Sequence, residues 1–124
     1  SSEDYERLDY NEVADRLKAV VPHEHQLFLS NLKEIMVLGD YAFVHAGIRP
    51  GIPIAEQKLT ETRWIRDPFL DHRAPLEKMV VHGHTVVEEA EILPHRIGID
   101  TGAYQSDRLT ALMLEDQARE IFST

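Results

Sequence analysis

The chain has 124 residues, of which 43% are hydrophobic, so it has the size of one small domain with enough apolar side chains for a core. Its formal net charge of -9, from 22 acidic and 13 basic residues, argues against general binding to nucleic acids or membrane surfaces. The absence of cysteine excludes disulfides and thiolate metal sites, and leaves His, Asp, Glu and Asn as metal ligands. No apolar run approaches the ~20 residues of a transmembrane helix, and the N-terminus is acidic, so we expect a cytoplasmic protein.

The first 32 residues have the spacing of helices. Asn11 is predicted to cap a first helix, which Pro22 ends. A second helix is expected after Pro22, with Leu27, Phe28 and Leu32 on its buried side.

From residue 33 onward the pattern predicts strands. Two apolar runs separated by Gly39-Asp40 predict a β-hairpin, which leaves Asp40 as a turn residue. The segment 48–53 is expected to be a rigid loop, and 54–75 to form short helices or turns packed on one apolar side. Further strands are expected at 79–82, 92–93, 97–100, 109–114 and 121–122, with a polar turn at Glu115-Asp116-Gln117. Helices followed by mainly antiparallel strands indicate an α/β class, α+β by segment, as in one half of a layered sandwich.

Two apolar runs end in histidines: Tyr41-Ala42-Phe43-Val44-His45 and Met79-Val80-Val81-His82-Gly83-His84. Residues that alternate on an unbroken strand share a face, so His82 and His84 would point the same way and join His45 in a three-imidazole metal site. Gly83 can instead mark a bend. The four other histidines, His23, His25, His72 and His95, are expected to be surface residues.

Two charged residues have alternative interpretations. Arg66 follows Trp64, which we expect to be buried and to fix the arginine for bidentate binding of a phosphate or carboxylate. Equally, Arg66 can form an ion pair with Asp67, Asp71 or Glu61. Asp100 can orient a histidine ligand, although satisfying the backbone amides of its Gly-containing turn is the favoured interpretation.

Several motifs occur in order: FVHAGIRPG (Phe43–Gly51), WIRDPFL (Trp64–Leu70), VVHGHT (Val80–Thr85) and IGIDTGAY (Ile97–Tyr104), followed by RLTALML (Arg108–Leu114). Together they resemble the C-terminal half of the bacterial phosphoprotein (serine/threonine) phosphatases, which belong to the calcineurin-like metallophosphoesterase superfamily. The resemblance covers nearly the whole chain beyond about Pro22.

The resemblance implies part of a four-layer α/β/β/α sandwich, in which two divalent metal ions activate a water that attacks phosphorus. It makes His45 and His84 ligands of one metal, Arg66 a contact of the phosphate and Tyr104, by a weak alignment, a residue that lines the pocket. His82 falls at a position that is not a ligand. Mn is the expected metal, and Fe, Zn and Ni also suit such ligands.

The chain departs from the family in one large respect. The N-terminal motifs Gly-Asp-x-His-Gly, Gly-Asp-x-Val-Asp-Arg-Gly and Gly-Asn-His-Glu, which supply the remaining ligands and the general acid, do not occur here. We therefore expect residues 1–124 to be the C-terminal half of one domain, helical over 1–32 and sheet-rich over 33–124, with no catalytic residue and no activity alone.

The leading functional hypothesis is hydrolysis of phosphomonoesters, with a phosphorylated protein or a small phosphoester as substrate. The alternatives are a dinucleoside tetraphosphate hydrolase of the same superfamily and a non-catalytic half-domain. The last would act by self-association or by pairing with a separate N-terminal half, since half a sandwich exposes apolar sheet surface.

Overall fold

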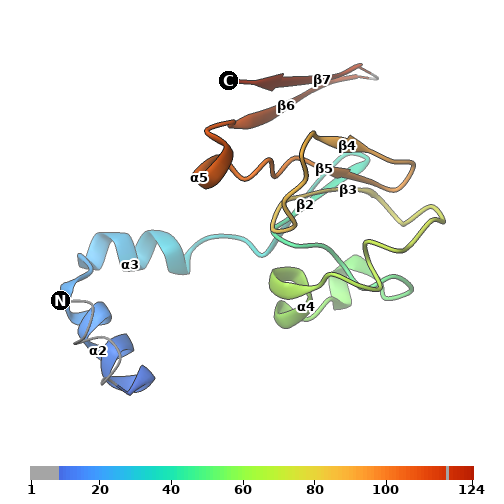
Figure 1. The fold of residues 1–124 in the computed structure, drawn as a ribbon. Coiled ribbons are helices and arrows are strands. Elements are labelled where there is room, and N and C mark those ends of the chain that lie inside the picture. The colour runs from blue at the N-terminus through green and yellow to red at the C-terminus, as the bar shows by residue number, and fades with distance from the viewer. Residues whose placement is uncertain (1–8, 117) are drawn as a thin grey trace. The chain divides into compact units, whose positions relative to one another are not determined.

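The computed structural model describes residues 9–116 and 118–124, which form two units. Contacts divide the chain between Lys33 and Glu34, and each unit is described by itself. Two helices make up the described part of the first unit, and all strands of the described residues lie in the second unit (Figure 1). None of the helices in the described ranges is long and apolar enough to cross a membrane.

The first unit consists of α2 (Tyr10–Val20) and α3 (His23–Ser30). The N-cap of α2 is Asp9, whose carboxylate accepts from the Asn11 amide, so the prediction that Asn11 caps the helix is wrong. Asp is as good an N-cap as Asn, and the helix begins two residues earlier than expected. Neither helix contains a buried residue, and Leu32, beyond the end of α3, is 54% exposed, so the expected buried side at Leu27, Phe28 and Leu32 is wrong. Two short helices bury too little surface to enclose a core.

The second unit is built on a five-stranded sheet in the order β1-β2-β3-β5-β4. Its strands are β1 (Ile35–Leu38), β2 (Tyr41–Val44), β3 (Met79–His82), β4 (Glu91–Ile92) and β5 (Arg96–Gly98). The Gly39-Asp40 turn joins β1 and β2 in the predicted hairpin, with Gly39 at a φ of 55°. The α/β class is confirmed.

The centre of this sheet is parallel, because β3 pairs in parallel with both β2 and β5. The expectation of mainly antiparallel strands is therefore wrong for this sheet. Parallel neighbours need a crossover, and residues 45–78 supply one that contains η1 (Ile54–Glu56) and α4 (Leu59–Trp64). These short helices were expected from the mixed pattern of 54–75. β2 and β3 therefore end at the same edge of the sheet.

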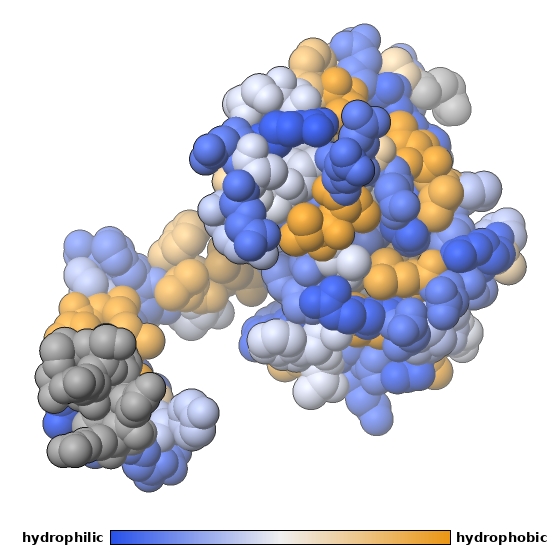
Figure 2. Space-filling model, in the orientation of Figure 1, coloured by the Kyte–Doolittle hydropathy of each residue, from blue (hydrophilic) through white to orange (hydrophobic). Residues whose placement is uncertain are grey.

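The core lies between the sheet and the crossover. Its buried apolar residues are Ala46, Ile48, Ile65, Phe69 and Val80. Other apolar side chains reach the surface at several separate places on the face drawn in Figure 2. Exposed apolar side chains also lie on the edge strand β1, where Met36, Val37 and Leu38 are all more than 40% exposed.

A separate hairpin ends the chain. It pairs β6 (Thr110–Glu115) with β7 (Ala118–Ser123) and follows the short helix α5 (Ala103–Ser106). Of the predicted turn between these strands, Gln117 lies outside the described residues. The Arg119 Nε of β7 donates to the Tyr41 hydroxyl at 3.0 Å, and its guanidinium lies 5.7 Å from the centre of the Tyr41 ring, which ties the hairpin to β2.

Among the described glycines, Gly47 has the least room for a side chain. Its φ of 152° is unfavourable for other residues, and a Cβ added there would lie 2.3 Å from Cδ1 of Phe69. Gly47→Ala is expected to lower the free energy of unfolding by about 2 kcal/mol or more, because Phe69 is fully buried and cannot yield without leaving the core. Urea denaturation measures the change.

Gly51→Ala is the matched control. Gly51 also has a positive φ, of 82°, but a Cβ added there meets no atom within 4 Å. The free energy of unfolding of this variant should fall by only about 1 kcal/mol, the cost of a left-handed backbone conformation in a residue with a Cβ. Equal losses in the two variants would show that contact with Phe69 is not the cause.

Candidate metal and phosphate site

The parallel pairing of β2 with β3 brings two histidines together. His45 directly follows β2, and His84 lies two residues beyond the end of β3. The amide of Gly83 donates to the carbonyl of His45 at 2.8 Å, so the two strand ends are joined by their backbones. The ring centres of His45 and His84 are 5.0 Å apart, with the planes inclined at 60°.

This spacing suits two ligands of one metal ion. Two imidazoles bound at ~2.0–2.1 Å to one tetrahedral ion have their ring centres about 5 Å apart. Among the described residues, neither ring makes a hydrogen bond, so nothing described competes for their nitrogens. Across the ranges 9–116 and 118–124, however, no three His, Asp or Glu side chains converge on one metal position. The described chain therefore offers a pair of imidazoles, which alone would bind a metal weakly.

His82 does not belong to this pair. It is 3% exposed, and its ring packs edge-on to Phe69 with centres 5.0 Å apart. An arginine can only donate, so the contact of Arg96 Nη1 with Nε2 at 3.2 Å makes Nε2 the acceptor, and Nδ1 donates to the Gly83 carbonyl at 3.1 Å. Burial is the main cause that lowers the pKa of His82, consistent with this neutral form.

The backbone at His84 explains why the simple strand pattern fails. Its φ is 64°, in the left-handed region, so the alternation of β3 stops at Gly83 and His82 and His84 do not share a face. Strained backbone of this kind in a non-glycine residue occurs disproportionately at functional sites. The expectation of three histidines on one metal is therefore wrong in its geometry.

Asp100 lies beside the histidine pair. Its Oδ1 accepts from the Gly102 amide at 3.0 Å, which is the turn role favoured by the sequence. It also lines a cavity of about 350 Å³ together with His45 and His84. A Cβ added at Gly83 would lie 3.6 Å from Oδ2 of Asp100, so the glycine allows the carboxylate to approach the loop.

Burial favours the neutral form of His84. Burial lowers the pKa of His84 most, the neighbouring Arg66 guanidinium and the His45 side chain lower it further, and the carboxylate of Asp100 acts in the opposite direction. Neutral imidazole is the form that binds metals. This electrostatic environment therefore favours the ligating state of the side chain.

Arg66 lies next to this pair. Its Nη1 donates to the hydroxyl of Thr85, the residue after His84, at 3.0 Å, and its side chain is exposed. Within the described chain no ion pair involves Arg66, and Glu61, one of its expected partners, instead binds Arg49 at 2.7 Å. The guanidinium retains donors directed at solvent, which suits the binding of a phosphate.

Trp64 differs from the sequence expectation. It is 71% exposed, not buried, because it is the last residue of α4 and the following Ile65 enters the core instead. Its ring stands edge-on to His84 with centres 5.6 Å apart. The sequence could not predict this exposure, because a Trp-Ile pair looks the same in the sequence whether both residues or only the isoleucine is buried.

Tyr104 is not brought to the site by any described contact. It lies on α5 and is 80% exposed, and no described hydrogen bond or ring contact joins it to His45, His84 or Arg66.

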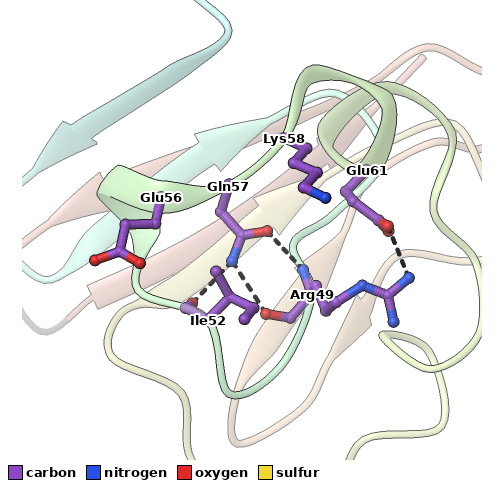
Figure 3. A pocket seen from close by; sticks show the side chains of 6 residues that line it. All are labelled: Arg49, Ile52, Glu56, Gln57, Lys58 and Glu61. Atoms are coloured by element: carbon purple, nitrogen blue, oxygen red, sulfur yellow. Dashed lines mark hydrogen bonds and ion pairs between the residues drawn. The ribbon is translucent and has the colours of Figure 1, made fainter.

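The loop after His45 is fixed by one side chain. Gln57 accepts from the Arg49 amide at 2.8 Å and donates to the carbonyls of Arg49 at 3.0 Å and Ile52 at 2.8 Å (Figure 3). The cavity that Figure 3 shows here has a volume of about 300 Å³ and also contacts Lys58 and Glu56. The predicted rigid loop is therefore held by Gln57 as well as by its prolines.

Comparison with solved structures identifies a similar fold. One similar structure is described as the "Crystal structure of a putative diadenosine tetraphosphatase"; the TM-score is 0.70 and the sequence identity 21%. The match covers 87% of this chain and 58% of the other, so this chain spans little more than half the length of that structure. At this identity the similarity establishes the fold alone. No protein-family profile and no curated protein matches the sequence.

The imidazole pair generates a direct binding prediction. The 124-residue chain is expected to bind Zn²⁺ weakly, and His84→Ala to weaken that binding at least ~10-fold, because one of two ligands is removed. Isothermal titration with Zn²⁺ alone measures it. His25→Ala, in the exposed helix α3, is the control and should leave the affinity unchanged. Unaltered Zn²⁺ binding by His84→Ala would contradict the assignment.

Proposed function

We propose that this chain forms one wall of a metal-dependent phosphoesterase site. The observation that carries the proposal is the pair His45 and His84, held 5.0 Å apart at the joined ends of two parallel strands. The exposed guanidinium of Arg66, next to the pair through Thr85, supports phosphate as the group bound. The similar fold of the diadenosine tetraphosphatase-like structure is consistent with this class of reaction.

His45 and His84 would hold one of two divalent ions, with Mn first among the candidates and Fe, Zn and Ni as alternatives. When bound, such ions supply charge stabilisation and a more acidic water. Arg66 would bind the phosphate oxygens and orient the ester, and Asp100 would keep the loop of His84 in place from its side of the cavity. Tyr104 has only its sequence position to support a role in the pocket.

The leading candidate within this class is hydrolysis of phosphomonoesters of the serine/threonine phosphatase type, as the ordered motifs suggest. We predict that the complete polypeptide encoded by the reading frame hydrolyses p-nitrophenyl phosphate in the presence of Mn²⁺. His84→Ala should lower kcat/KM at least ~100-fold, and Arg66→Ala ~10–100-fold, the cost of ~1.5–3 kcal/mol expected for losing charged hydrogen bonds.

Arg16→Ala is the matched control for charge. Arg16 is exposed on α2, where it pairs with Glu12 of the same helix, and its loss should leave kcat/KM unchanged. Full activity in His84→Ala, or equal losses in Arg16→Ala and Arg66→Ala, would contradict the proposal.

A dinucleoside tetraphosphate hydrolase is the second candidate, and the exposed Trp64 favours it. An aromatic ring beside His84 offers a surface on which a nucleobase can stack, a contact worth ~1–3 kcal/mol. In this case Trp64→Ala should raise KM for diadenosine tetraphosphate ~5–100-fold and leave KM for methyl phosphate unchanged, while Trp64→Phe keeps most of the affinity. Equal changes of KM for both substrates would exclude base stacking on Trp64.

A further inference from the structure

A second group of histidines lies at the opposite end of the parallel strands. His95 immediately precedes β5, and its carbonyl accepts from the amide of Val80 at 3.1 Å, so it lies beside the beginning of β3. His84 follows the other end of the same strand. The two places are therefore separated by the length of β3, and His95 is no part of the proposed phosphoesterase site.

His95 and its neighbour His72 were both expected at the surface, and the structure contradicts this. His95 is 1% exposed and His72 is half-buried. Their rings meet edge-on with centres 5.5 Å apart and planes inclined at 83°. The sequence pattern missed them because His95 follows a proline in a short loop and His72 lies in a polar segment, positions typical of surface residues.

Four buried nitrogens of this group have no hydrogen-bond partner in the described part of the chain. They are Nδ1 and Nε2 of His95, Nε2 of His72 and Nε of Arg96. A buried polar atom without a partner is destabilising, so four of them on three neighbouring side chains is an unusual concentration. All four belong to basic side chains, which indicates what kind of group could satisfy them.

The side chains that lower the pKa of His95 are all basic. Burial lowers the pKa of His95 most, and Arg96, His72 and Arg73 lower it further, with no carboxylate acting in the opposite direction. Glu91 binds Nη1 of Arg96 at 2.9 Å and leaves Nε of Arg96 without a partner. A positive potential of this kind repels a metal cation and attracts an anion.

A cavity borders the cluster at His72, the one cluster residue among its described lining residues. Its volume is about 400 Å³, and apolar residues that include Ile48, Ile52 and Leu76 form much of its wall. The single carboxylate among its described lining residues is Glu77, one oxygen of which accepts from the amide of Ile54 at 3.2 Å.

We propose that His72, His95 and Arg96 form an internal binding site for a small oxyanion, of which inorganic phosphate is the example, reached through the cavity beside His72. In this site one nitrogen of each neutral imidazole would donate its N–H to the anion, and Arg96 would donate its Nε–H. The site goes beyond the proposed phosphoesterase function and does not depend on it.

The test uses the 124-residue chain, with EDTA present to exclude metal-dependent binding of phosphate. Phosphate is added at constant ionic strength, with NaCl as the control, while long-range 1H-15N NMR spectra record the imidazole nitrogens. The signals of His72 and His95 should shift and saturate with phosphate but not with chloride. Those of His23 and His25, on the exposed helix α3, should not shift. Absence of a saturable shift at His95 would overturn the proposal.

Variants separate this site from the first one. His95→Leu should weaken phosphate binding, followed at the signals of His72, at least ~10-fold, and Arg16→Ala, an exposed arginine on α2, should leave it unchanged. Since His95→Leu can fail to fold, His72→Phe provides a second variant with the same expected loss. Binding abolished by Arg66→Ala but retained in His72→Phe would assign the phosphate to the proposed phosphoesterase site. Shifts of His72 and His95 caused by Zn²⁺ in a separate sample without EDTA, together with no response to phosphate, would make the cluster a metal site. Either result would overturn the proposal.

Discussion

The parallel pairing of β2 with β3 is the constraint on which the candidate site depends. Both strands run toward the same edge of the sheet, and the hydrogen bond from Gly83 to the carbonyl of His45 joins the loops that follow them. The crossover between the strands must pack tightly, and Phe69 over Gly47 shows how little space remains. The geometry of the two imidazoles therefore follows from backbone pairing and core packing together.

The same strands carry opposite chemistry at their two ends. At the carboxyl ends, His45, His84 and Asp100 share a partly open cavity in which a carboxylate faces the imidazoles. At the amino ends, His72 and His95 are enclosed among positive groups. Imidazole is common to both places, but the neighbouring charges differ. A carboxylate nearby favours a cation, whereas guanidinium groups favour an anion.

The sequence was sufficient for the parts of the fold and site that depend on local pattern. The turn at Gly39-Asp40 and the strand ends at His45 and His84 follow from apolar runs and turn residues. The sequence was not sufficient for features that are determined by contacts between distant segments. Parallel pairing, the exposure of Trp64 and the burial of His95 all depend on which distant segments meet. The left-handed backbone at His84 likewise results from the junction of two loops.

His45 and His84 are positioned by the backbone of their loops, and within the described chain their rings make no hydrogen bonds that hold the fold together. Residues of this kind can be exchanged during evolution with little loss of stability, unlike His82, which is bonded on both ring nitrogens and buried against Phe69. Substitutions can therefore remove the candidate metal ligands while the fold is retained. Homologues that keep Gly47, Phe69 and His82 but lack histidine at positions 45 and 84 would retain the same architecture without the proposed metal ligands, and these two positions alone would identify them.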